Sequence, residues 1–173
     1  MSLADLLCNI GIVYVKESLG QGGKSIGVYK IRTMVPDADK GLEGALNSVH
    51  DKYGHPVNDS RITWWGEQLR KYFINELPQL YNLIRGDIKL VGVRPMREMD
   101  WKRYPPELKE EALKQKPGFF GVHLAYKGDG DFNTHVRVLQ QYLERRRQNP
   151  VRTDIHYLWQ VLINISIHGI RGS

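Results

Sequence analysis

The segment that decides the fold of this chain contains Asn75-Glu76-Leu77-Pro78-Gln79-Leu80, followed by Gly86-Asp87 and by Val91-Gly92-Val93-Arg94-Pro95. It predicts a helix over residues 76–84. A proline in the first turn leaves no amide hydrogen unbonded, and a glycine suits the left-handed position that ends a helix. Apolar residues recur at helical spacing and predict a buried stripe on this helix, formed by Leu77, Leu80, Tyr81 and Ile84.

Upstream of this segment, two runs rich in β-branched and aromatic residues predict a hairpin. Ile12–Val15 and Ile26–Tyr29 are separated by Leu19–Gly23, whose glycines suit a turn. A phosphate-binding loop is the alternative interpretation of these glycines. Gly23-Lys24-Ser25 leads into a strand rather than a helix, so the turn is favoured.

Helices are predicted on both sides of the segment, at 37–51, 63–71, 105–114, 133–148 and 154–167. Thr63 is the expected cap of the second of these, with Trp64, Leu69 and Phe73 on its buried side. The predicted architecture is α+β: a helix-rich single domain over residues 1–173, with a small N-terminal β-hairpin.

Length and composition narrow the class of protein. The 173 residues fit one domain, and 41% hydrophobic with 25% charged residues is usual for a globular protein. The single cysteine, Cys8, excludes an internal disulfide and indicates a reducing compartment. A net charge of +6 favours acidic partners such as phosphates, nucleic acid or anionic lipid. No apolar run is long enough to predict a transmembrane helix.

Ordered motifs covering roughly residues 11–125 resemble those of the bacterial sugar transferases, the monotopic phosphoglycosyl transferases. The segment described above matches the family's catalytic region, although the family has Asp-Glu where this chain has Asn75-Glu76. The other matching motifs are Tyr29-Lys30-Ile31-Arg32-Thr33-Met34 with Asp37-Ala38-Asp39, Gly66 to Arg70, and Lys116-Pro117-Gly118 with Gly121.

The resemblance implies a reaction as well as a fold. Members of the family move a sugar phosphate from a nucleotide diphosphate sugar, typically a UDP-sugar, to polyprenyl phosphate at the cytoplasmic face of the bacterial inner membrane. This reaction serves polysaccharide or glycoconjugate biosynthesis. An aspartate attacks the β-phosphorus, UMP leaves, and the phosphosugar passes to the lipid phosphate, while Mg²⁺ offsets charge.

The expected partners of this chain are therefore a nucleotide-sugar, polyprenyl phosphate and a membrane surface. Nucleic acid is not expected, because the basic residues are scattered over several segments and no helix-turn-helix pattern occurs.

Position-by-position matching assigns the expected site. Asn75 and Glu76 occupy the two positions of the family's catalytic acid pair. Glu76 is the expected Mg²⁺ ligand, because oxygen donors suit this cation. A solvated acid in the first turn is the alternative for Glu76. Asp87 and Pro95 are expected to shape the surrounding backbone. The expected phosphate-binding residues are Lys30, Arg32, Arg70 and Arg94, and a structural or surface role is the alternative for each arginine.

Asn75 is the departure from the family with the largest consequence. A carboxamide is a far poorer nucleophile than a carboxylate and brings no negative charge to Mg²⁺. Three explanations are open: natural loss of activity, an engineered Asp-to-Asn change, or attack by Glu76. Val122 to Gly128 also departs from the family's Trp-Ala-Gln-Val-Asn-Gly-Arg and lacks its arginine, which favours natural divergence. Weak or absent transfer is expected, and the alternative is an inactive nucleotide-sugar-binding or regulatory domain of the same fold.

Family members carry a hydrophobic membrane helix upstream of the segment where this chain begins, so a soluble relative or a truncated form is expected here. The apolar stripe on one face of the last helix is predicted to pack on the protein's own core. The alternative is a peripheral membrane contact, since basic residues lie near this stripe. The stripe comprises Leu158, Trp159, Leu162 and Ile165, and the basic residues are Arg145 to Arg147, Arg152 and Arg171.

Overall fold

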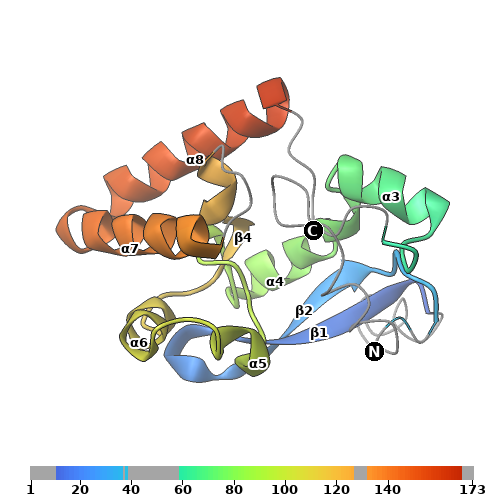
Figure 1. Ribbon diagram of the computed structural model, residues 1–173, viewed down its shortest axis with the longest axis horizontal. Coiled ribbons are helices and arrows are strands. Elements are labelled where there is room, and N and C mark those ends of the chain that lie inside the picture. The colour runs from blue at the N-terminus through green and yellow to red at the C-terminus, as the bar shows by residue number, and fades with distance from the viewer. Residues whose placement is uncertain (1–10, 37, 39–58, 127–131, 169–173) are drawn as a thin grey trace.

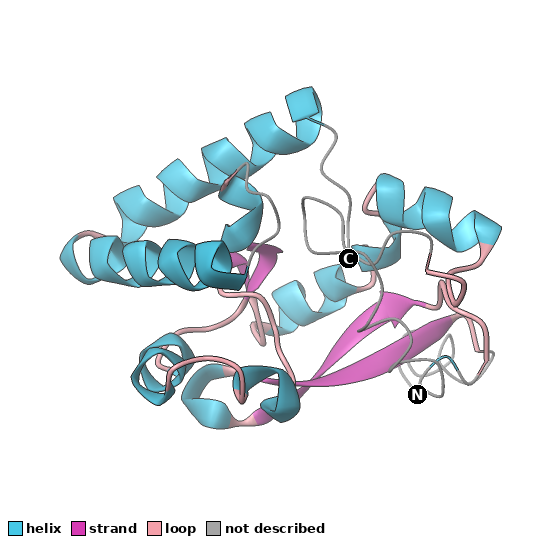
Figure 2. Ribbon diagram, in the orientation of Figure 1, coloured by secondary structure: helices cyan, strands magenta, loops and turns pink. Residues whose placement is uncertain are grey.

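A computed structural model describes residues 11–36, 38, 59–126 and 132–168 of the chain (Figure 1). Figure 2 shows helices and short strands combined in the α+β class that the sequence predicts, which is confirmed. The strands are β1 Val13–Leu19, β2 Ser25–Ile31, β3 Lys89–Gly92 and β4 Gly118–Gly121. The helices are α3 Trp64–Lys71, α4 Gln79–Arg85, α5 Glu98–Trp101, α6 Pro106–Leu113, α7 Phe132–Gln148 and α8 Pro150–His168, with 3₁₀ turns η1 Gln21–Gly23, η3 Ile74–Glu76 and η4 Val122–Ala125.

The predicted hairpin is confirmed and is longer than expected at both strands. β1 and β2 pair antiparallel, with Val13 opposite Ile31 and the glycine-containing turn η1 between them. Alternation along β2 turns Val28 and Lys30 to the same face, and both are buried. The hairpin therefore directs a lysine toward the interior of the protein.

A second sheet, which the sequence did not reveal, consists of the short parallel pair β3–β4. Val91 lies opposite Phe120, and Gly92 lies opposite Gly121. The backbones approach so closely at Gly118 that a side chain there would collide with Gly92. This pairing places the residues that follow β3 beside those that follow β4.

The C-terminal helices form much of the hydrophobic core. Figure 1 shows α7 and α8 together at one end of the protein, away from the β1–β2 hairpin. Tyr142 of α7 and Tyr157 of α8 are fully buried and meet edge to face, with ring centroids 4.9 Å apart. Asp154 ties this pair to β3, because its carboxylate accepts hydrogen bonds from Lys89 Nζ and Tyr142 OH, each at 2.7 Å.

The predicted buried stripe on the helix after Glu76 is wrong for three of its four residues; the fourth, Tyr81, is half-buried and packs against Tyr29. Leu77, Leu80 and Ile84 are 50%, 44% and 84% exposed, whereas Gln79 and Asn82 of α4 are buried. Hydrogen bonds between α4 and β2 explain the reversal: Asn82 Nδ2 donates to the Gly27 carbonyl at 2.7 Å, and Asn82 Oδ1 accepts from the Tyr29 amide at 3.1 Å. The polar side of the helix consequently faces the sheet. Its predicted end at Gly86 is confirmed, since Gly86 is left-handed with φ of 77°.

The predicted cap of α3 is confirmed, but part of its predicted buried side is wrong. Thr63 Oγ1 accepts a hydrogen bond from the Gly66 amide at 3.1 Å. Trp64 is 81% exposed, because the side of α3 that faces inward carries Gly66, packed against the backbone of Thr33. The helix predicted at 37–51 lies outside the described residues, apart from residue 38.

The stripe predicted on the last helix is divided between core and surface. Leu158 and Ile165 pack against the core, while Trp159 and Leu162 are 65% and 42% exposed. Among the described residues, no helix combines the length and apolar composition needed to cross a bilayer. Arg171 of the predicted basic cluster lies outside the described residues.

Candidate active site

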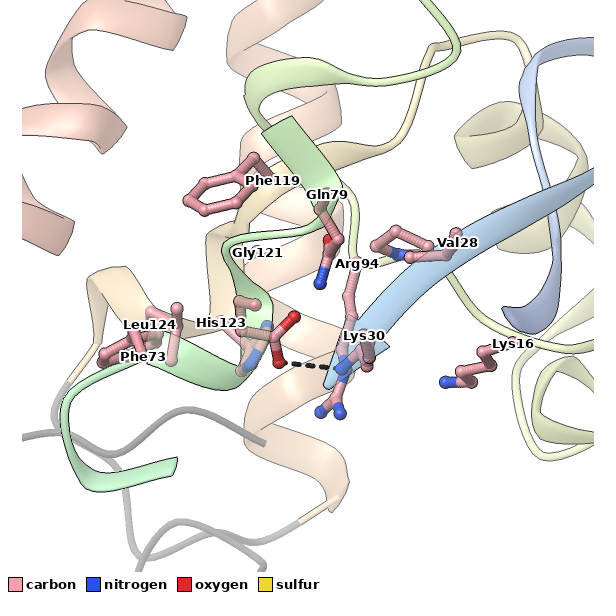
Figure 3. A pocket seen from close by; sticks show the side chains of 12 residues that line it. Lys16, Val28, Lys30, Phe73, Gln79, Arg94, Phe119, Gly121, His123 and Leu124 are labelled. Atoms are coloured by element: carbon pink, nitrogen blue, oxygen red, sulfur yellow. Dashed lines mark hydrogen bonds and ion pairs between the residues drawn. The ribbon is translucent and has the colours of Figure 1, made fainter. Parts of the chain in front are cut away.

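A pocket between the hairpin, the turn η3 and the β3–β4 pair brings together expected site residues from different motifs (Figure 3). Lys30, Glu76, Arg94 and Pro95 all line it. Their positions depend on three separate chain segments that meet only in the fold. The other lining residues are Lys16, Val28, Phe73, Gln79, Phe119, Gly121, His123 and Leu124.

A buried ion pair lies at the centre of the expected site. Lys30 Nζ donates to Glu76 Oε1 at 2.7 Å, and the two side chains are 10% and 9% exposed (Figure 3). Burial lowers the pKa of Lys30, while the charge of Glu76 and its hydrogen bond act in the opposite direction. A carboxylate at this depth depends on its ammonium partner for stabilisation.

The turn η3 places Asn75 and Glu76 inside the protein. Phe73, the residue before this turn, has a left-handed backbone with φ of 59°, which is rare for a non-glycine residue. The two following inward residues, Asn75 and Glu76, are 2% and 7% exposed. Asn75 Nδ2 lies 3.4 Å from Glu76 Oε1, so the amide occupies the position of the family's first acid directly beside the second.

The four expected phosphate-binding residues separate into two groups. Lys30 and Arg94 line the pocket. Arg70 Nε instead donates to Thr33 Oγ1 at 2.9 Å, and Arg32 is exposed with its Nε donating to the Gly11 carbonyl at 3.2 Å. Burial is the main cause of a lowered pKa of Arg70, whose guanidinium also interacts electrostatically with Glu76. Phosphate binding by all four residues remains a prediction.

Asp87 and Pro95 differ in their relation to the pocket. Pro95 lines it. Asp87 lies at the end of α4, where its carboxylate accepts a hydrogen bond from Asn82 Nδ2 at 3.2 Å and pairs with Arg85 at 3.4 Å. These contacts support the expected backbone role of Asp87 by fixing the turn that leads into β3.

Sequence reasoning missed Lys16 and His123 in the pocket and the buried Asn82 behind it. Hairpin register was the available signal for Lys16. Lys16 pairs with Val28, and directly opposite residues of an antiparallel pair point to the same face, which also carries Lys30. No local pattern marks His123. Its ring lies over Gly121 of β4, and it reaches the pocket only because β4 is paired with β3 in the fold.

The donors around the pocket do not fit a magnesium ion held by the protein alone. Within the part of the chain that the structure describes, no cluster of three or more acidic, histidine or cysteine side chains could hold a metal. Glu76 is the one carboxylate among the described lining residues, and its Oε1 is engaged by Lys30. Mg²⁺ is usually bound by one or two carboxylates together with substrate phosphates. An ion beside Glu76 would therefore need oxygens from a bound diphosphate.

Comparison with known proteins agrees with the motifs collected in this pocket. Residues 3–167 match the family described as bacterial sugar transferase. The undecaprenyl-phosphate galactose phosphotransferase of Salmonella typhimurium is 34% identical over 131 residues, which cover 72% of this chain and 27% of that protein. The UDP-galactose-lipid carrier transferase of Erwinia amylovora is 33% identical over 131 residues, with the same coverage of both chains.

The exopolysaccharide production protein ExoY of Rhizobium meliloti is 32% identical over 140 residues, covering 77% of this chain and 62% of that protein. The chain thus spans between about a quarter and three fifths of the length of these relatives. Because the family match covers nearly the whole sequence, this chain belongs to the bacterial sugar transferase family.

Proposed function

We propose that this chain has the catalytic fold of a transferase that moves sugar phosphate from a UDP-sugar to polyprenyl phosphate, and that Asn75 limits its turnover. The observation that carries the proposal is the meeting of Lys30, Glu76 and Arg94 in one pocket beside Asn75. The relatives' names support the substrates: one names undecaprenyl phosphate and galactose, and another names UDP-galactose and a lipid carrier. The proposed place of action is the cytoplasmic face of the bacterial inner membrane.

The proposed chemistry needs a carboxylate at position 75. Such a carboxylate oxygen would form a bond to the β-phosphorus while the bond from that phosphorus to the UMP oxygen breaks, and UMP would take the electron pair. An oxygen of polyprenyl phosphate would then attack the same phosphorus and release the carboxylate. We expect Lys30 and Arg94, which both line the pocket, to stabilise the phosphate oxygens in both steps.

In the chain as it stands, Asn75 offers a neutral amide for the first step. Glu76 is poorly placed to replace it, since Lys30 engages its Oε1 at 2.7 Å. The buried Asn75 therefore also supports a second candidate function, a nucleotide-sugar-binding or regulatory domain without turnover. Magnesium remains a prediction from the resemblance, and Glu76 is the residue that would contact it together with the diphosphate.

One assay separates these functions. The chain is mixed with UDP-galactose and vesicles containing polyprenyl phosphate, with Mg²⁺ or with EDTA, and released UMP and labelled lipid are quantified beside calorimetric binding of UDP-galactose. We expect binding with little or no UMP release. Rapid release by the unaltered chain would contradict the assigned effect of Asn75. If neither UDP-galactose nor other UDP-sugars bound under any condition, both candidate functions would be wrong.

We also propose that the acceptor lipid is reached through the exposed apolar residues of segment 64–84. These side chains belong to α3, η3, α4 and the connections between them. The turn η3 carries the Asn75–Glu76 pair, and α3 contacts η3. Tryptophan and tyrosine favour the membrane interface, and Lys71 and Arg85 of the same segment can attract anionic lipid. The exposed residues are Trp64, Trp65, Tyr72, Ile74, Leu77, Leu80 and Ile84.

Replacing Trp64 and Ile84 together by serine is expected to weaken binding to anionic vesicles by at least about tenfold, because each is a large exposed side chain whose transfer from water is favourable. Vesicle sedimentation at low and high salt measures this loss. The matched control replaces Ile155 and Trp159, two exposed residues of α8, by serine. Binding that is lost in the α8 variant and kept in the Trp64/Ile84 variant would assign docking to α8 instead.

A further inference from the structure

Lys16 enters the pocket from β1, on the side opposite the turn η3. Figure 3 shows its side chain directed toward Lys30 and Arg94. Its position follows from the hairpin register, since Lys16 lies opposite Val28 on the face that also carries Lys30. The side chain is half-buried, so its ammonium is partly removed from water.

The described residues that line the pocket carry more positive than negative charge. Glu76 pairs with Lys30, which leaves Lys16 and Arg94 as a cation pair within the pocket. Among described residues, no hydrogen bond or ion pair joins the Lys16 ammonium or the Arg94 guanidinium to an acceptor. Two like charges that line one pocket disfavour each other, and an anion bound between them would reduce this cost.

The pKa of Lys16 shows that its charged form is disfavoured in this pocket. Burial is the largest cause that lowers the pKa of Lys16, to about 7, and the nearby charges of Arg94, Lys30 and Arg97 lower it further. Asp100 acts in the opposite direction. An amine in this environment is protonated readily when an anion arrives, because the anion favours its charged form.

We propose that Lys16 and Arg94 together bind the diphosphate group of the nucleotide-sugar, and that this binding requires no divalent metal ion. The proposal rests on the function proposed above, since it names the side chains that recognise the donor in the same pocket. Each phosphate of the diphosphate carries negative charge at neutral pH, and the cation pair supplies a matching charge on each side. Arg94 can hold two phosphate oxygens through its planar guanidinium, whereas Lys16 acts as a point charge.

This arrangement links binding of the donor to proton uptake. Below about pH 7 Lys16 is already charged in the free protein, so binding is strongest there. Above that pH the free lysine is neutral and must take up a proton when the diphosphate binds. Affinity is then expected to fall by up to about tenfold for each further pH unit, until the raised pKa of the complex is reached.

The test is calorimetric titration of the intact chain with UDP-galactose in EDTA, from pH 6 to pH 9, in two buffers of different ionisation enthalpy. We expect binding without metal, and proton uptake above pH 7. Lys16→Met should weaken binding at pH 6.5 by at least about tenfold, the usual loss when a hydrogen bond to a charged group is removed. The matched control Lys24→Met, at an exposed position beside the hairpin turn, should bind like the unaltered protein.

Lys16→Arg distinguishes ligand binding from a structural role. Arginine keeps the charge at every pH in this range, so this variant should bind UDP-galactose with little dependence on pH and little proton uptake. Equal affinity of Lys16→Met and the unaltered protein, or binding that appears only with Mg²⁺, would overturn this inference while leaving the proposed function intact. Failure of every form to bind, with or without Mg²⁺, would overturn the proposed function itself.

Discussion

Replacing Asn75 by aspartate is expected to raise the rate of UMP release from a UDP-sugar by about 10⁴-fold, the lower range of losses seen when a covalent nucleophile is removed from an enzyme. The physical reason is that a carboxylate oxygen can attack phosphorus, whereas the amide of Asn75 is a weak nucleophile. Asn75 is 2% exposed and already lies beside Glu76, so the substitution changes the chemistry of the site with little change in shape.

The new carboxylate would also interact with Glu76. Asn75 Nδ2 is 3.4 Å from Glu76 Oε1, and two carboxylates at such a distance raise the pKa of one of them. Lys30 and the cation pair oppose this effect by favouring the charged forms. We therefore expect the activity of the Asn75→Asp variant to rise from acid to neutral pH as the second carboxylate ionises.

Released UMP is measured for Asn75→Asp, Asn75→Ala and the control Asn133→Asp, which adds the same charge at an exposed position of α7. The alanine variant and the control should remain as slow as the unaltered chain. Should Asn75→Asp bind UDP-galactose and still release no UMP with polyprenyl phosphate present, the proposed catalytic role of position 75 would be wrong.

Replacing Lys30 by methionine is expected to lower the free energy of unfolding by about 3–5 kcal/mol, the usual cost of removing one partner of a buried ion pair. Glu76 is 7% exposed and would lose the ammonium that lies 2.7 Å from its Oε1. Urea unfolding, followed by circular dichroism, measures the change through the midpoint and slope of the transition.

The double variant Lys30→Met with Glu76→Met is expected to recover most of this loss, because apolar side chains of similar volume can replace a buried ion pair at little net cost. Lys24→Met serves as the control. Lys24 is exposed, so this variant should unfold like the unaltered protein. A Lys30→Met variant with an unchanged transition would mean that the ion pair contributes little to stability. A double variant less stable than either single one would contradict the assigned desolvation cost.

Local sequence patterns were sufficient for the hairpin and for the ends of several helices. β-Branched residues on both sides of a glycine turn predicted β1 and β2, because their strands adjoin in the chain and pair without a long loop. Thr63 predicted the start of α3 and Gly86 the end of α4, since both signals act through hydrogen bonds or backbone angles within a few residues. These features depend on interactions between residues that are close in the chain, so the sequence alone predicts them.

Which face of α4 is buried could not be predicted in the same way. Its apolar spacing predicted a buried stripe, but Ile84 is 84% exposed and Asn82 is fully buried. The deciding contacts join Asn82 to Gly27 and Tyr29, more than fifty residues earlier in the chain. Periodicity indicates that a helix has two faces, and only the partner surface decides which face turns inward.

For the candidate site too, the sequence determined some features and the tertiary structure decided others. The sequence by itself determined that Lys30, Glu76 and Arg94 are expected site residues, because ordered motifs identify the family and residue type carries the chemistry. Tertiary structure alone decided that Lys16 shares their pocket, that Arg32 is exposed outside it, and that Glu76 is paired with Lys30. Electrostatic interaction depends on distance and burial, and both arise only when the hairpin, η3 and the β3–β4 pair pack together.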